Sequence, residues 1–145
     1  ITKCTGREAS EPTENEEIQQ KRIYVAPGDH HLTIHRSGTR TFFRINKDEP
    51  EGFCRPAVNV MFRSLARSYP HATLAVVLTG MGQDGMLGAQ ELVATGSVVF
   101  AQDRKTSVVW GMPGAVAEAG LAHRVLPLGR IAASVAESCQ QRAKA

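Results

Sequence analysis

The stretch T-L-A-V-V-L-T-G-M-G-Q-D-G-M-L-G, from Thr73 to Gly88, predicts a strand, a glycine-rich turn and the start of a helix in direct succession. Leu74 to Leu78 is an unbroken apolar run rich in β-branched residues, which is typical of a strand buried on both faces. Asp84 stands at the expected start of the helix, where its carboxylate can cap backbone N–H groups. In an open α/β sheet such a turn lies at the carboxyl end of its strand, where functional sites gather.

The composition is that of one ordinary globular domain. The chain has 145 residues, of which 42% are hydrophobic and 21% charged. A net charge of +3 from scattered basic residues, with few aromatic residues, argues against a nucleic-acid partner. Three widely spaced cysteines, Cys4, Cys54 and Cys139, favour free thiols in a reducing compartment. No apolar run approaches the roughly 18 residues that span a bilayer, so we expect a cytoplasmic protein without membrane insertion.

Hydrophobic periodicity and turn residues predict strands and helices that alternate through the second half of the chain. The elements expected before the central stretch are a short edge strand at Ile1 to Cys4, a strand within Arg22 to Asp29, a hairpin within His31 to Ile45 with its turn at Ser37-Gly38, and a helix opened by Pro56 and ended by Pro70. Those expected after it are a helix from Asp84 to Ala94, a strand at Ser97 to Ala101, a short helix from Pro113 to Glu118, a strand at Arg124 to Leu126 and a final helix from Leu128 to Cys139. This order predicts an α/β fold with a largely parallel sheet. We expect a single domain over residues 1–145, in which residues 1–22 form a polar connector.

Three interpretations of the glycine turn remain open on the residues alone. G-M-G-Q-D-G at Gly80 to Gly85 fits the dinucleotide-binding pattern G-x-G-x-x-G, although Asp84 would then place a negative charge beside a pyrophosphate. The glycines can instead serve only a tight turn, with Asp84 as a helix cap. Asp84 can also be the acid of a Ser-His-Asp triad, which needs a rigidly held carboxylate to orient an imidazole. Spacing does not choose among them.

Four segments of the chain, in the same order, resemble the catalytic domain of chemotaxis protein-glutamate methylesterases. They are L-T-G-M-G-Q-D-G-M-L-G at 78–88, I-Y-V-A-P-G-D-H-H-L at 23–32, R-P-A-V-N-V-M-F-R-S at 55–64, and G-M-P at 111–113 with V-L-P-L at 125–128. The resemblance implies a Rossmann-like three-layer α/β sandwich with a mostly parallel sheet and a β-hairpin. In the segment at 55–64, Ala57 and Asn59 stand where the family usually has a serine and an aspartate.

The resemblance also implies a function and a site. The family hydrolyses γ-glutamyl methyl esters on the cytoplasmic tails of chemoreceptors, can deamidate receptor glutamines, and uses no metal or organic cofactor. The aspartate of this turn is the family's triad acid, so that role is expected for Asp84. Met81, with Gly80 and Gly82 beside it, is expected to line the active site. His30 and His31 are expected to make hydrogen bonds within their loop rather than to act as bases.

The other two triad members are not matched in this chain. The family's nucleophilic serine lies in a Ser-x-x-Gly-Gly turn, and both it and the catalytic histidine precede the segment that matches Ile23. Residues 1–22 contain neither that turn nor a histidine. The chain is therefore expected to be the C-terminal two-thirds of the domain without its first strands, and a phosphorylatable receiver domain is a further expected partner. A truncated homologue that binds receptor tails or another partner without catalysis remains the alternative.

Overall fold

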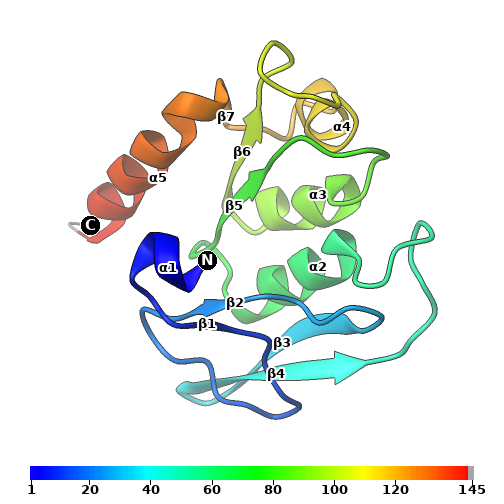
Figure 1. Ribbon diagram of the computed structural model, residues 1–145, viewed down its shortest axis with the longest axis vertical. Coiled ribbons are helices and arrows are strands. Elements are labelled where there is room, and N and C mark those ends of the chain that lie inside the picture. Colours follow the sequence, from blue (N-terminus) through cyan, green and yellow to red (C-terminus); the bar gives the residue numbers. More distant parts are fainter. Residues whose placement is uncertain (144–145) are drawn as a thin grey trace.

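Three parallel strands form the central sheet, in the spatial order β5-β6-β7 (Figure 1). They are β5 (Leu74–Val77), β6 (Val98–Gln102) and β7 (Arg124–Leu126). The computed structural model describes residues 1–143, so the predicted domain end at Ala145 lies outside the described residues. The prediction of an α/β fold with a parallel sheet is confirmed.

Helices connect the strands and cover the sheet. They are α3 (Met86–Ala94) between β5 and β6, α4 (Met112–Glu118) between β6 and β7, and α5 (Leu128–Ala143) after β7. All three contact β6, and the core cluster consists of Phe62, Ala66, Ala75, Val77, Ala89, Leu92, Val99 and Val116. Among the helices of residues 1–143, none is long and apolar enough to cross a membrane.

A further helix packs against α3, and a β-hairpin packs against the other side of that helix. The strands β3 (His31–Ser37) and β4 (Arg40–Asn46) pair antiparallel as predicted, and α2 (Val58–Ser68) lies between this hairpin and α3 (Figure 1). Ser64 Oγ accepts a hydrogen bond from the Ile34 N–H at 2.9 Å, and Ser68 Oγ donates to the Ile34 carbonyl at 3.0 Å. The two buried serines of α2 therefore satisfy backbone groups of β3, which explains polar residues on the inner side of this helix.

The first 22 residues differ in part from the prediction. A short helix, α1 (Thr2–Thr5), stands where a short edge strand was expected, so that prediction is wrong. Its backbone groups are satisfied locally, because the Thr5 N–H donates to the Ile1 carbonyl at 3.1 Å and Gly6 ends the helix with φ 65°. Farther along, β1 (Ala9–Ser10) pairs in parallel with β2 (Ile23–Tyr24), and residues between them hydrogen-bond the backbone of β4.

Two further expectations are corrected by the fold. In β5, Ala75 and Val77 are buried while Leu74 and Val76 are only half-buried, so burial on both faces is wrong for this strand. The reason is that α3, α4 and α5 all contact β6, whereas α4 is the main helix that contacts β5, so less helix surface covers the side chains of β5. Pro56 does not open α2 from inside its first turn, because it precedes the N-cap residue Ala57 and follows a cis peptide bond.

The crossing of α2 and α3 depends on Gly88, which generates a first prediction. A Cβ added at Gly88 would lie 2.6 Å from Phe62 Cβ and 3.0 Å from the Asn59 backbone, neither of which can move unless the helices separate. We expect Gly88→Ala to lower the free energy of unfolding by about 1–3 kcal/mol, measured by urea denaturation. Gly129→Ala in α5 is the matched control, because nothing lies within 4 Å of its added Cβ. Equal stability of the two variants would contradict this account of the crossing.

Candidate active site

The glycine turn after β5 leads directly into α3 and lies against the segment before α4. Gly80 accepts hydrogen bonds from the N–H groups of Gly111 at 3.2 Å and Met112 at 2.8 Å. A Cβ at Gly111 would lie 2.5 Å from the Gly80 carbonyl oxygen, so this close approach requires glycine. Gly85 is the N-cap of α3 with φ 93°, a left-handed conformation that favours glycine. The turn is therefore held on both sides, and Asp84 projects from its rigid end.

The sequence suggested that Asp84 caps the helix that follows it, but the structure shows a different set of bonds. Its Oδ2 accepts a hydrogen bond from the Val58 N–H at 2.7 Å, and its Oδ1 accepts one from the Asn59 N–H at 2.9 Å. These amides begin α2, whose own N-cap residue, Ala57, makes no side-chain cap. Asp84 therefore caps α2, whose first amides lie 25 and 26 residues before it in the sequence. The prediction that Asp84 caps the helix that follows it is wrong.

Asn59, in turn, caps the N-terminus of α3. Its Oδ1 accepts hydrogen bonds from the Gly85 N–H at 3.0 Å and the Gly88 N–H at 2.9 Å, and the side chain is buried. Two helix N-termini thus converge on one carboxylate and one amide, and each N-terminus contributes partial positive charge there. The arrangement also argues against dinucleotide binding, because the α3 amides that a pyrophosphate would use are already bonded to Asn59.

A cavity of about 160 Å³ opens beside Asp84. It is lined by residues of the loop before α2, of α2 itself and of the glycine turn with α3: Glu51, Gly52, Asn59, Gln83, Asp84, Met86 and Leu87. Glu51 forms a two-pronged ion pair with Arg63. Hydrogen bonding by the Arg63 guanidinium lowers the pKa of the Glu51 carboxyl, and a hydrogen bond from Asn59 lowers it further. Asp84 is therefore anchored on one side and open to a cavity on the other.

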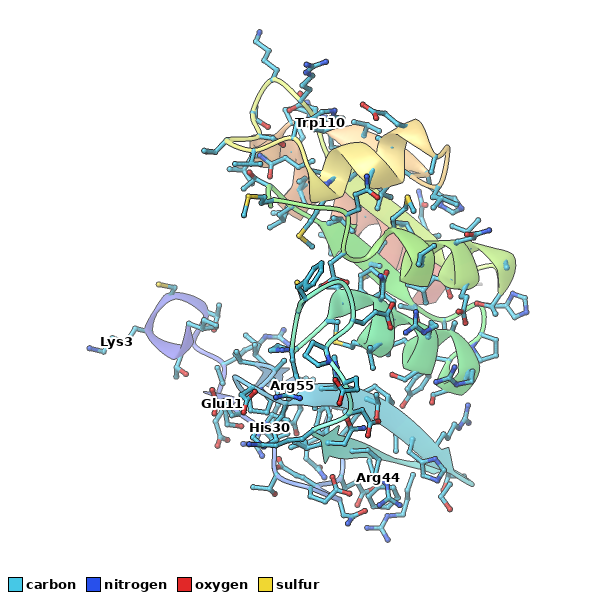
Figure 2. The ribbon with its side chains drawn as sticks, turned by 90° about the vertical axis from the view of Figure 1, so that its right-hand side faces the viewer. Lys3, Glu11, His30, Arg44, Arg55 and Trp110 are labelled. Atoms are coloured by element: carbon cyan, nitrogen blue, oxygen red, sulfur yellow. The ribbon has the colours of Figure 1, made fainter. Side chains whose placement is uncertain are left out.

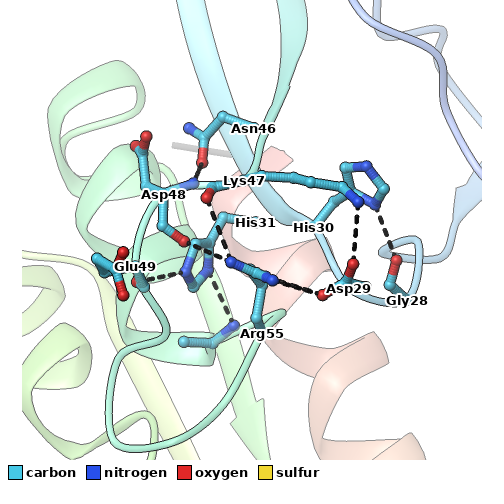
Figure 3. A network of polar contacts seen from close by, with 10 residues as sticks. Gly28, Asp29, His30, His31, Asn46, Lys47, Asp48, Glu49 and Arg55 are labelled. Atoms are coloured by element: carbon cyan, nitrogen blue, oxygen red, sulfur yellow. Dashed lines mark hydrogen bonds and ion pairs between the residues drawn. The ribbon is translucent and has the colours of Figure 1, made fainter.

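A polar network holds the loop that supplies one wall of this cavity (Figure 3). Arg55 donates to the carbonyls of Lys47 at 3.2 Å and Asp48 at 3.1 Å, and forms an ion pair with Asp29 at 2.6 Å. His31 is fully buried and contacts the Glu49 carbonyl through Nε2 at 3.1 Å. Because a carbonyl can only accept, Nε2 carries the proton there, and Nδ1 accepts from the Ala57 N–H at 3.3 Å.

This network lies on the hairpin side of the molecule, far from the end that carries Trp110 (Figure 2). His30 Nδ1 contacts the Gly28 carbonyl at 2.9 Å, and both bonds of His31 are to backbone groups. The expectation of a hydrogen bond within the loop is confirmed for His30, whereas His31 begins β3 and bonds backbone groups outside its own loop, at Glu49 and Ala57. His31 links the loop at Glu49 to the start of α2, and so joins the cavity wall to the helix that Asp84 caps.

The other residues that the sequence singled out are placed around the turn in different ways. Gly80 packs against Met112, Gly82 has φ 82°, and Met81 is 86% exposed. The residues that line the cavity beside Asp84 are instead Gln83, Met86 and Leu87. Sequence reasoning missed Asn59 and Glu51. The absence of a capping side chain at Ala57 was the one signal that a distant acceptor is needed, and nothing local identifies which residue supplies it.

Comparison with known proteins gives one consistent result. The family model described as CheB methylesterase matches residues 1–135. The chain is 52% identical over 132 residues to a protein-glutamate methylesterase/protein-glutamine glutaminase of Paramagnetospirillum magneticum, covering 91% of this chain and 35% of that protein. It is 47% identical over 142 residues to a protein of the same description from Rhodospirillum rubrum, covering 98% of this chain and 37% of that one.

A solved structure agrees with the sequence relatives. The crystal structure of the Thermotoga maritima CheB methylesterase catalytic domain superposes with a TM-score of 0.85 at 39% sequence identity. The match covers 88% of this chain and 67% of that domain. The chain therefore spans about two-thirds of the solved catalytic domain and 35–37% of the two full-length relatives.

The cross-capping by Asn59 generates a stability prediction. Asn59→Ala leaves the buried N–H groups of Gly85 and Gly88 without an acceptor, so we expect the free energy of unfolding to fall by about 1–3 kcal/mol. Asn46→Ala is the matched control, because the bond that Asn46 Oδ1 accepts from the Asp48 N–H is exposed. We expect that change to stay within about 0.5 kcal/mol. Urea denaturation of both variants tests this, and equal losses would show that the Asn59 bonds contribute little.

The Asp29 ion pairs generate a prediction about pH. Hydrogen bonds from Arg55 first, and then from Lys47, lower the pKa of the Asp29 carboxyl from 3.8 to about 2. Because the folded-state pKa is depressed, the pairing stabilises the loop above pH 3.8 and this contribution is lost as the pH falls toward about 2. An NMR titration of the Asp29 carboxyl carbon should have its midpoint at about 2, and Arg55→Ala should move that midpoint back toward 3.8. An unchanged midpoint in that variant would contradict the assignment of cause.

Proposed function

The chain belongs to the CheB methylesterase family, and from that membership we propose that the protein hydrolyses γ-glutamyl methyl esters on chemoreceptors through a Ser-His-Asp triad. Asp84 is the triad acid in this proposal. The observation that carries it is the geometry of the Asp84 carboxylate, which is fixed by two amides of α2 and opens to a cavity at the carboxyl end of β5. The names of the relatives also include glutaminase activity, so deamidation of receptor glutamines is part of the proposal.

Asp84 has the hydrogen-bonding capacity that the triad acid needs. An ionised carboxylate offers about four lone-pair sites, and the two bonds to α2 leave the others available for an imidazole N–H. The acid must hold the imidazole in one tautomer and stabilise the imidazolium that forms during the reaction. A carboxylate that cannot rotate, because both of its oxygens are bonded to a helix start, suits that task.

The serine and the histidine come, in this proposal, from residues beyond this chain. The chain covers 67% of the solved catalytic domain, which leaves room for both groups. The serine oxygen attacks the glutamyl ester carbonyl while the histidine takes its proton, and methanol leaves with a proton returned by the histidine. Water then hydrolyses the acyl-enzyme by the same proton transfers. The relatives' greater length also leaves room for a receiver domain, which stays a prediction.

The decisive variant is Asp84→Asn in the longer protein that includes the serine and the histidine. The equivalent change in a serine protease lowers kcat about 10⁴-fold, and we expect a loss of similar size in methanol release from methylated receptor. The amide also offers one acceptor oxygen where the carboxylate offers two, so we expect a loss of stability of about 1–2 kcal/mol. Rates are therefore measured well below the melting temperature of the variant.

Asn59→Ala separates the two effects of Asp84→Asn. It weakens the same turn but keeps the carboxylate, so its rate should fall far less than that of Asp84→Asn at similar stability. Near-normal methanol release from Asp84→Asn would remove Asp84 from the triad. A wild-type protein that binds receptor fragments but releases no methanol would favour the alternative of a non-catalytic binding module.

A further inference from the structure

The turn at residues 51–54 presents an aromatic side chain in an unusual way. Glu51 and Cys54 pair through two backbone hydrogen bonds, of 3.2 Å and 3.0 Å. The two residues between them, Gly52 and Phe53, have φ of 58° and 65°. Positive φ at both central residues is the pattern of a type I′ turn, which favours glycine, asparagine or aspartate. A bulky side chain is costly at such a position, so the turn itself does not account for Phe53.

Packing within the chain does not account for Phe53 either. Its relative exposure is 103%, so the whole ring is in contact with solvent. An aromatic ring that projects from a tight turn and packs against nothing in the described part of its own chain is the kind of group that anchors protein interfaces. The turn fixes the direction of the Phe53 Cα–Cβ bond in advance, which reduces the backbone entropy lost when a partner binds.

The position of the turn identifies the partner. Glu51 and Gly52 line the same cavity as Asp84, so Phe53 stands at the rim of the proposed ester site. The turn that carries Asp84 contributes a further exposed apolar side chain, Met81 at 86% exposure, and the start of α3 contributes Leu87, which is 49% exposed and also lines the cavity. A protein segment that places a glutamyl side chain in this cavity must therefore lie against apolar groups from both turns.

We propose that Phe53, together with Met81 and Leu87, binds apolar side chains that flank the methylated glutamate in the substrate segment, and that Phe53 is a residue that selects the substrate. The proposal rests on the proposed function, because the occupant is defined by the reaction at Asp84. The chemistry of the rim agrees with it. The Glu51 carboxylate is paired with Arg63, and the methyl ester is neutral, so apolar contact remains as the main attraction at this edge of the cavity.

The test compares two substrates of the longer, active protein. One is a methylated cytoplasmic fragment of a receptor, and the other is a small glutamyl methyl ester that lacks flanking residues. Phe53→Asn removes the ring while suiting the left-handed backbone of the turn. We expect kcat/KM for the receptor fragment to fall about tenfold relative to kcat/KM for the small ester, with the effect on KM rather than kcat. Phe53→Tyr should restore the ratio.

Leu128→Ala is the matched control, because Leu128 is 54% exposed and apolar but does not line the cavity. Its ratio should equal that of the wild type. A ratio within twofold of wild type for Phe53→Asn would overturn the proposal. A clear drop in the melting temperature of Phe53→Asn would also overturn it, because the ring would then be packed within the longer protein itself. Failure of the wild type to release methanol from either substrate would instead refute the proposed function, and this inference with it.

Discussion

Two helix starts, those of α2 and α3, are each capped by a side chain from the other's segment. Ala57 and Gly85, their N-cap residues, offer no side-chain acceptor, and Asp84 and Asn59 supply the acceptors across the helix pair. Leaving several amides of a buried helix start unpaired is costly, so neither helix can keep its position if the other moves away. The close crossing at Gly88 makes this exchange possible, because a larger residue there would hold the two segments too far apart.

The sequence predicted the elements well and their mutual contacts poorly. Alternation in 31–45 and the apolar runs at 74–78 and 97–101 report local geometry, and the hairpin and parallel strands are where these patterns indicated. The target of the Asp84 carboxylate depends instead on which helix start lies beside it in space, and short-range patterns favoured the helix that follows it. The wrong prediction of a strand at residues 1–4 has a related cause, because so short a run has weak local preferences. One helical turn, α1, satisfies the backbone groups there without a sheet partner.

The site therefore combines a structural and a chemical requirement in one side chain. In many proteins a carboxylate at a helix start is an exposed cap of modest value, and its loss is tolerated. Here the two amides of α2 fix both oxygens of Asp84, while the cavity leaves one side of the carboxylate open. A triad acid needs this combination, because it must be immobile before the substrate arrives and must still accept a bond from an imidazole. The bonds from the α2 amides hold the Asp84 carboxylate in place, and its open side leaves room for a bond from an imidazole.

The exchange of caps between Asp84 and Asn59 explains how the chain tolerates Ala57 and Asn59, the two departures from the family's usual helix start. A serine at 57 could cap α2, but Asp84 already accepts from the first two amides, so alanine there leaves them satisfied. An aspartate at 59 could accept from Gly85 and Gly88 as the asparagine does, but it would bring a second negative charge close to Asp84. Like charges at short distance oppose each other's ionisation. Asn59 keeps the acceptor, removes that charge and turns its amide toward Glu51, whose pKa it helps to lower. The substitution therefore preserves the geometry of the turn and places no second carboxylate beside Asp84 at position 59.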